Sequence, residues 1–204
     1  MIGIVDYGLG NIKAFVNIYK KLDVGLSVVR AKKDLDGITK IILPGVGAFD
    51  HAMTQFSNSG MREAVEELVL GKKAPLIGIC VGMQMLANTS DEGKLNGLGW
   101  IDGSVRLIDT SGLSSATRLP HMGWNDVVRQ RESPILKSFE TTSEFYFLHS
   151  YCFHCDNQED VIATASYGFD FAAIVSNGNV YGIQCHPEKS HHSGIAILRN
   201  FAEI

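Results

Sequence analysis

A cysteine between two glycines has the setting of a catalytic nucleophile. Cys80 lies in the pattern Gly78-x-Cys80-x-Gly82, directly after the apolar run 76–79. This is the cysteine form of a nucleophile elbow, in which glycines let a strand and a helix cross closely and the middle residue stands at the carboxyl edge of a sheet. A helix that starts at Val81 would point free N–H groups and its positive end at the sulfur, which favours the thiolate. A buried structural cysteine fits these five residues about as well.

A histidine and a carboxylate follow another apolar run. Residues 180–184 predict a strand, and His186 and Glu188 come directly after it, two residues apart. In an extended segment, side chains at this spacing lie on one side of the backbone, so the carboxylate could hold the imidazole. Each residue alone could be structural or solvated. Together with the elbow they favour a thiol–imidazole–carboxylate triad.

A second glycine-rich loop could supply an oxyanion hole. The sequence Pro-Gly-Val-Gly-Ala at 44–48 follows a predicted strand at 41–43. Its glycines free the backbone to turn N–H groups inward. A donor near Val46 or Gly47 could then act with the N–H of Val81 on a developing oxyanion. Without the elbow, this segment would be an ordinary loop between a strand and a helix.

The order of elements predicts an α/β fold. Strands at 2–5, 26–29 and 41–43, a helix at 12–22, a helix at 49–70 interrupted by Gly60, and a strand-turn-helix unit at 74–88 alternate along the chain. This alternation is typical of a parallel sheet with helices on both faces. Further strands are predicted at 104–108, 124–128, 145–148, 161–166, 172–176 and 180–184, a type I′ hairpin turn at Asn177-Gly178, a polar loop at 110–118 and a last helix at 194–202. We expect one domain over residues 1–204, with a mixed, largely parallel sheet of flavodoxin-like type.

Composition narrows the possible partners and ligands. The 204 residues carry a net charge of −4, which disfavours nucleic acid and anionic membranes as partners. Four cysteines, no signal peptide and no membrane-length apolar run predict a cytoplasmic protein. Lys13 stands where a dinucleotide fingerprint needs its third glycine, and Cys152 and Cys155 would face opposite sides of a strand. We therefore expect neither a cofactor nor a metal. His191-His192, just before the last helix, is interpreted as a solvated cap region.

Six segments carry a resemblance to a known family. They are D-Y-G-L-G-N at 6–11, P-G-V-G at 44–47, G-I-C-V-G-M-Q at 78–84, P-H-M-G-W-N at 120–125, H-S-Y at 149–151 and H-P-E-K-S at 186–190. From residue 2 to the last helix, the chain resembles the class I (triad) glutamine amidotransferases. Val81 stands where leucine is usual, and Cys152 where a second aromatic residue is common. Neither departure touches the triad.

The resemblance implies hydrolysis of the glutamine side-chain amide. Cys80 would attack the amide, His186 would move the proton, and Glu188 would orient His186. The oxyanion donors would be the N–H of Val81 and one near Val46 and Gly47. The implied substrate-binding residues are Gly45, Gln84, His149, Ser150 and Tyr151.

The resemblance also implies a partner, because the glutaminase fold fills this chain and the ammonia must be used elsewhere. The segments match most closely the glutaminase subunits that form a heterodimer with a (β/α)8-barrel cyclase. That cyclase makes imidazole glycerol phosphate and aminoimidazole carboxamide ribotide in histidine biosynthesis, and it is expected to raise the glutaminase rate. The candidate interface residues are Asn11, Pro120, Trp124, Asn125 and Lys189. Two alternatives stay open: a subunit that supplies ammonia to a sugar-modifying enzyme, and a cysteine hydrolase without a partner.

Overall fold

A sheet of nine strands forms the centre of the computed structural model, which describes residues 1–111, 118–137, 139 and 141–204. Its first half is parallel and has the order β2 (Leu26–Val29), β1 (Ile2–Val5), β3 (Lys40–Gly45), β4 (Leu76–Cys80) and β12 (Val180–Ile183). Its second half is antiparallel and continues with β11 (Asp170–Asn177), β10 (Val161–Ser166), β7 (His121–Arg129) and β8 (Thr142–His149). The α/β class with a mixed sheet is therefore confirmed.

The parallel strands are apolar because they are covered on both faces. Every residue of β1, β4 and β12 is buried. Continuous apolar runs of this kind are typical of central strands in α/β sheets. The register places β4 between β3 and β12, so Gly45 pairs with Cys80 on one side and Ile183 pairs with Ile79 on the other. Segments from the beginning, middle and end of the chain thus meet at the carboxyl edge of β4.

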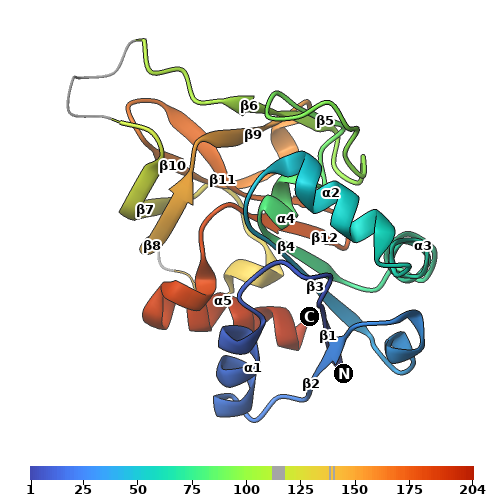
Figure 1. The fold of residues 1–204 in the computed structure, drawn as a ribbon. Helices are drawn as coiled ribbons and strands as arrows, with labels where there is room; N and C mark the ends of the chain where they lie inside the picture. The colour runs from blue at the N-terminus through green and yellow to red at the C-terminus, as the bar shows by residue number, and fades with distance from the viewer. Residues whose placement is uncertain (112–117, 138, 140) are drawn as a thin grey trace.

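Helices cover both faces of this half of the sheet (Figure 1). On one side lie α1 (Ile12–Lys21) and α5 (His191–Glu203), which are linked by a 2.9 Å hydrogen bond from the Tyr19 hydroxyl to the Leu198 carbonyl. On the other side lie α2 (Phe49–Asn58), α3 (Arg62–Glu66) and the π-helical turn η2 (Glu67–Gly71). Gly60 separates α2 from α3 with a φ of 70°, which confirms the predicted interruption.

A smaller sheet packs beside the first. It has the order β5 (Thr89–Ser90), β6 (Gly103–Leu107) and β9 (Tyr151–Cys155). The chain passes from the large sheet to the small one at Ser150, between the end of β8 and the start of β9. Short 3₁₀ turns complete the fold: η1 (Lys32–Leu35), η3 (Pro134–Leu136), η4 (Gln158–Asp160) and η5 (Pro187–Lys189).

The helix after Cys80 is shorter than predicted. Helix α4 covers only Val81–Gln84, whereas the sequence predicts helix to residue 88. The N–H groups that follow take other partners: Leu86 N donates to Met83 O at 3.0 Å with 3₁₀ spacing, and Asn88 N donates to Gly103 O at 3.0 Å. One helical turn has only a small dipole, so the free N–H groups at its start are its main means of favouring a thiolate.

Two other details differ from the sequence-based predictions. The hairpin loop consists of Gly178 and Asn179, and of these only Gly178 has a positive φ, 58°, so the predicted type I′ turn is wrong. The Asn179 side chain instead donates to Val69 O and Ala74 O at 2.8 Å each, which fixes the hairpin to the start of β4. His191 and His192 belong to the first turn of α5 rather than preceding it. Most of the polar loop at 110–118 lies outside the described residues.

Within the described residues, no helix combines the length and the apolar character that crossing a membrane requires.

Candidate active site

The elbow places Cys80 in a strained backbone conformation. Cys80 ends β4 with φ 55° and ψ −114°, a region that non-glycine residues rarely occupy. The crossing behind it leaves no room for side chains: a Cβ added at Gly82 would collide with the carbonyl oxygen of Leu43, and one added at Gly45 would collide with the amide nitrogen of Gly82. The glycines of the elbow are therefore required by close packing, as the sequence predicts.

His186 is fixed by the strand on the opposite side of the site. Its backbone N–H donates to Tyr146 O at 2.9 Å. Its carbonyl accepts from the Ser190 hydroxyl at 2.6 Å, and that hydroxyl accepts from Tyr146 N at 3.0 Å. These bonds attach the segment after β12 to β8, so the imidazole is held against Cys80 by two strands.

Glu188 holds the imidazole by a short ion pair. Its Oε1 lies 3.0 Å from His186 Nδ1, and the two side chains are only 3% and 6% exposed. The expected pairing is confirmed, but the expected extended geometry is wrong, because residues 187–189 form the 3₁₀ turn η5. The turn brings the carboxylate back to the ring from two residues further along the chain.

The electrostatics of the site favour a protonated imidazole. Burial alone lowers the pKa of His186, but hydrogen bonds to the Cys80 and Glu188 side chains and the charges of both groups outweigh burial and raise it to about 10. Since Nδ1 faces Glu188, Nε2 is the nitrogen left for Cys80. The sulfur also accepts from Gln184 Nε2 at 3.8 Å and lies 4.0 Å from Leu148 O. The imidazolium and the Gln184 amide N–H can stabilise a thiolate at Cys80, whereas Leu148 O can only accept a hydrogen bond from the thiol.

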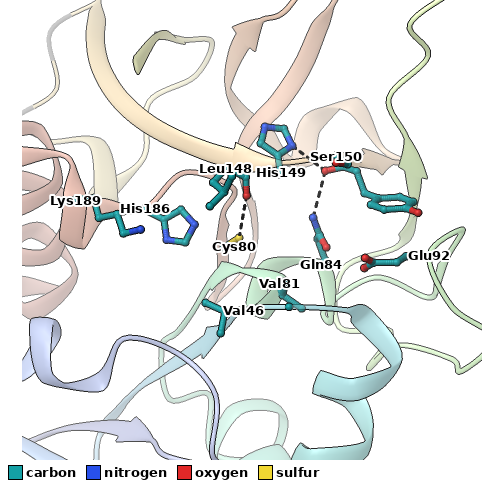
Figure 2. A pocket seen from close by; sticks show the side chains of 12 residues that line it. Val46, Cys80, Val81, Gln84, Glu92, Leu148, His149, Ser150, His186 and Lys189 are labelled. Atoms are coloured by element: carbon teal, nitrogen blue, oxygen red, sulfur yellow. Dashed lines mark hydrogen bonds between the residues drawn. The ribbon is translucent and has the colours of Figure 1, made fainter. Parts of the chain in front are cut away.

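A cavity of about 240 Å³ opens above Cys80 (Figure 2). It is smaller than the roughly 300–1,000 Å³ typical of sites for drug-sized ligands, so a substrate of amino-acid size suits it. The residues that line it are Val46, Gly47, Cys80, Val81, Gln84, Glu92, Leu148, His149, Ser150, Tyr151, His186 and Lys189.

The structure brings the predicted oxyanion segment to the cavity. Val46 and Gly47 both line the cavity, and Figure 2 shows Val46 below Cys80 and close to Val81. Gly47 has a φ of 86°, and Val46 is 39% exposed. Gly45, which the sequence predicts as a substrate contact, pairs with Cys80 and is absent from the described lining. Gly45 packs against the backbone of the elbow at Gly82.

The other four predicted substrate-binding residues all line the cavity: Gln84, His149, Ser150 and Tyr151. The side chains of Gln84 and His149 also donate hydrogen bonds to other groups of the protein. Gln84 Nε2 donates to Tyr151 O at 3.2 Å and to Gln184 Oε1 at 3.0 Å. His149 Nδ1 lies 2.9 Å from the same Tyr151 carbonyl. These side chains therefore shape the wall in addition to facing the cavity.

Sequence reasoning missed three residues of the site: Gln184, Leu148 and Glu92. Glu92 lies on the opposite side of the cavity from His186 (Figure 2). Its Oε2 accepts from Phe49 N at the start of α2 at 2.9 Å. No local pattern marks Glu92, because it belongs to a turn-rich segment that reaches the site only through the fold. Gln184 precedes the histidine motif by two residues and is the one that this motif could have indicated.

Four of the five candidate interface residues are exposed, and the fifth, Asn125, is partly buried. Trp124 is 42% exposed on the same face of β7 as Met122, and its ring stacks on His191 at 5.0 Å between centroids. Asn11, Pro120 and Lys189 are also exposed, and Lys189 lines the cavity as well. Asn125 points to the other face of the strand, where its amide nitrogen donates to Ser166 O at 2.8 Å.

Comparison with known proteins agrees with this geometry. Residues 3–204 match the family model described as glutamine amidotransferase class-I. The chain is 57% identical over 205 residues to the imidazole glycerol phosphate synthase subunit HisH of Bdellovibrio bacteriovorus, with 100% of both chains covered. It is 48% identical to the subunit of the same name from Leptospira borgpetersenii, again over 100% of both chains.

Solved structures show the same fold at low sequence identity. A structure titled glutamine amidotransferase has a TM-score of 0.75 at 18% identity and covers 100% of this chain and 99% of its own. The structure of PurLQS from Thermotoga maritima has a TM-score of 0.75 at 17% identity and covers 99% of this chain and 97% of its own. The chain thus belongs to the class-I glutamine amidotransferases.

Proposed function

We propose that this chain hydrolyses glutamine to glutamate and ammonia and passes the ammonia to a cyclase partner. The observation that carries the proposal is the placement of Cys80 at the base of an amino-acid-sized cavity, with the His186–Glu188 pair beside it. The family and the names of its full-length relatives support glutamine as the substrate.

Catalysis follows from the three side chains. The Cys80 thiolate attacks the carboxamide carbon, and the N–H of Val81 with one from Val46 or Gly47 stabilises the tetrahedral oxyanion. The His186 imidazolium donates its proton to the departing nitrogen, which leaves as ammonia. His186 is then the base that takes a proton from water as the water attacks the thioester. Glutamate and the free cysteine result.

Charge orients the substrate. Glu92 and Lys189 are the charged residues of the described lining besides His186, and they stand on opposite sides of Cys80 (Figure 2). A glutamine with its amide at the sulfur would direct its α-ammonium group toward Glu92. Ser150, on the same side of the cavity as Glu92 (Figure 2), lies near the backbone end of such a substrate.

The partner in this proposal is a (β/α)8-barrel cyclase that forms a heterodimer with this chain. Relatives named as subunits of imidazole glycerol phosphate synthase support it. The ammonia would serve the formation of imidazole glycerol phosphate and aminoimidazole carboxamide ribotide in histidine biosynthesis. Docking on the Trp124 surface would turn the segment at Val46 and Gly47 and raise the glutaminase rate. Four unpaired cysteine thiols suit a cytoplasmic location.

The relatives' names do not favour a subunit for a sugar-modifying enzyme or a hydrolase that acts alone. The proposal is tested by a chloroketone analogue of glutamine, which alkylates a thiolate in a glutamine site. Peptide mapping should find the label on Cys80, and excess glutamine should prevent it. Label on the other cysteines alone, or no protection by glutamine, would overturn the proposal. Cys152→Ala is the matched control, because it removes a buried thiol outside the triad.

A further inference from the structure

A buried pair of histidines, one of which lines the cavity, takes no part in the mechanism. His121 on β7 and His149 at the end of β8 are directly opposite each other in the antiparallel register. Their side chains are joined by a 3.0 Å contact between His121 Nδ1 and His149 Nε2, and the residues are 3% and 6% exposed. The His121 ring stacks between Phe147 and Tyr167, at 4.9 and 4.0 Å between centroids.

The contacts of this pair fix the position of each proton. His149 Nδ1 lies 2.9 Å from Tyr151 O, and a carbonyl can only accept, so this nitrogen carries the proton. His149 Nε2 is then a lone pair that needs a donor, which His121 Nδ1 supplies. His121 Nε2 in turn accepts from Asn125 Nδ2 at 3.2 Å. Hydrogen bonds therefore run in one direction from Asn125 through both rings to Tyr151.

Both rings are neutral in this arrangement. Burial lowers the pKa of His121 to about 4. For His149, burial likewise lowers the pKa, and with the smaller influences of the groups around it the value is about 3. A proton added to either ring would place two donors face to face.

The series of hydrogen bonds ends at Tyr151, which lines the cavity. The Tyr151 carbonyl accepts from His149 and also from Gln84 Nε2 at 3.2 Å, and Gln84 lies in the helix that follows Cys80. Ser150, between His149 and Tyr151, is the point where the chain crosses from the large sheet to the small one. The bond from His149 to Tyr151 thus closes the bend whose residues line the substrate cavity.

We propose that His121 is a positioning residue for the glutamine site: by donating to His149 Nε2, it holds that ring with its Nδ1–H on Tyr151 O and so keeps the bend at Ser150 in the shape that binds substrate. The inference rests on the proposed function and adds a residue that touches neither the substrate nor the triad. Without the donor at 121, the buried Nε2 lone pair of His149 is left unpaired, and the ring keeps only one of the two hydrogen bonds that fix its orientation.

Two variants separate the hydrogen bond from the packing. His121→Phe keeps a ring between Phe147 and Tyr167 but removes the donor. His121→Asn loses the ring but places an amide N–H where Nδ1 stood. In steady-state glutamine hydrolysis, we expect His121→Phe to raise KM about tenfold or more with kcat within about threefold, and His121→Asn to keep KM near the wild-type value. An unchanged KM in His121→Phe, or equal defects in both variants, would overturn the proposal.

The tautomers can be measured without any activity. In the ¹⁵N-histidine-labelled chain, two-bond nitrogen–proton couplings should show both His121 and His149 protonated on Nδ1. In His121→Phe, the resonance of the unprotonated His149 Nε2 should shift downfield, because its lone pair loses the hydrogen bond from residue 121. A wild-type His149 protonated on Nε2 would overturn the inference. A chain with the expected tautomers that hydrolyses no glutamine would instead contradict the proposed function, so the two failures are distinguishable.

Discussion

Glu188 directs its charge at a single ring nitrogen. Its Oε1 bonds His186 Nδ1, while its buried Oε2 has no hydrogen-bond partner among the described residues. The carboxylate therefore orients the imidazole and contributes to the raised pKa of His186, together with Cys80. Charge that is buried and paired in this way acts on its partner much more strongly than charge in water.

Glu188→Gln should keep the shape of the site but lose that charge. We expect kcat for glutamine hydrolysis to fall by about 10²- to 10⁴-fold, as is typical when an orienting carboxylate is neutralised. The pKa of His186 should fall, so the alkaline limb of the pH–rate profile should move to lower pH. Glu159→Gln, at an exposed ion pair with Arg131, is the matched control. A variant with wild-type kcat and an unmoved alkaline limb would contradict this role.

At the scale of elements, the site depends on close contact between the backbones of β3, β4 and α4. Three glycines allow that contact: Gly45, Gly78 and Gly82. At Gly82 an added methyl group would meet the backbone carbonyl of Leu43, which cannot move without disturbing the sheet. At Gly71, in the π-helical turn η2, an added methyl group would meet only the Glu67 side chain at 3.8 Å. The two positions therefore form a matched pair.

Gly82→Ala should destabilise the fold by about 1–3 kcal/mol, or roughly 2–12 °C in Tm, because the backbones must separate. It should also displace Cys80 and reduce glutamine hydrolysis. Gly71→Ala should change neither property appreciably. Thermal unfolding and the glutaminase rate check both expectations. Equal Tm values for the two variants would contradict the close crossing at the elbow.

The elements that local patterns specify could be predicted, and those set by distant contacts could not. Glycines at 78 and 82 and the apolar run of β4 predicted the elbow, because close crossing and burial act on neighbouring residues. The end of α4 depends on a distant strand, because Gly103 O at the start of β6 accepts from Asn88 N, which a longer helix would use internally. The hairpin turn is set by Asn179, which bonds to the segment before β4. Glu92 reaches the cavity only through the packing of the loop after β5 against α2.

At the scale of the whole molecule, the buried side chains of His121 and His149 make the free energy of unfolding depend on pH. The ordinary histidine pKa is 6.5, and burial lowers that of His121 to about 4 in the folded chain. Below pH 6.5 the unfolded chain therefore binds a proton that the folded chain does not. The free energy of unfolding must then fall as the pH drops from 6.5 toward 4. The pKa of His149 is lowered to about 3, so this residue also lowers the free energy of unfolding as the pH drops from 6.5 toward 3.

His121→Asn should reduce this acid sensitivity, because it removes one of the two rings. Urea unfolding at pH 7 and pH 5 measures the effect as the difference between the two free energies. We expect a smaller difference in the variant than in the wild type, whatever their stabilities at pH 7. Equal differences would show that His121 takes up its proton as easily in the folded chain as in the unfolded one.

The exposed face of β7 gives a test of partner binding. Trp124 is 42% and Val128 36% exposed, and both lie on this face. Large aromatic side chains at interface centres contribute about 2 kcal/mol or more, so Trp124→Ala should raise the Kd for the cyclase at least about thirtyfold. Val128→Ala, further along the strand, should have little effect. Calorimetric titration decides, and equal Kd values for the two variants would place the interface elsewhere.

The most direct test uses the complex of this chain with the proposed cyclase partner and compares two nitrogen sources. Cys80→Ala should lower product formation from glutamine by at least about a thousandfold, since Cys80 is the only thiol among the described residues that line the cavity. With ammonium salts as the nitrogen source, the same complex should work at the wild-type rate. A Cys80→Ala complex that still uses glutamine would contradict the central claim that this sulfur releases the ammonia.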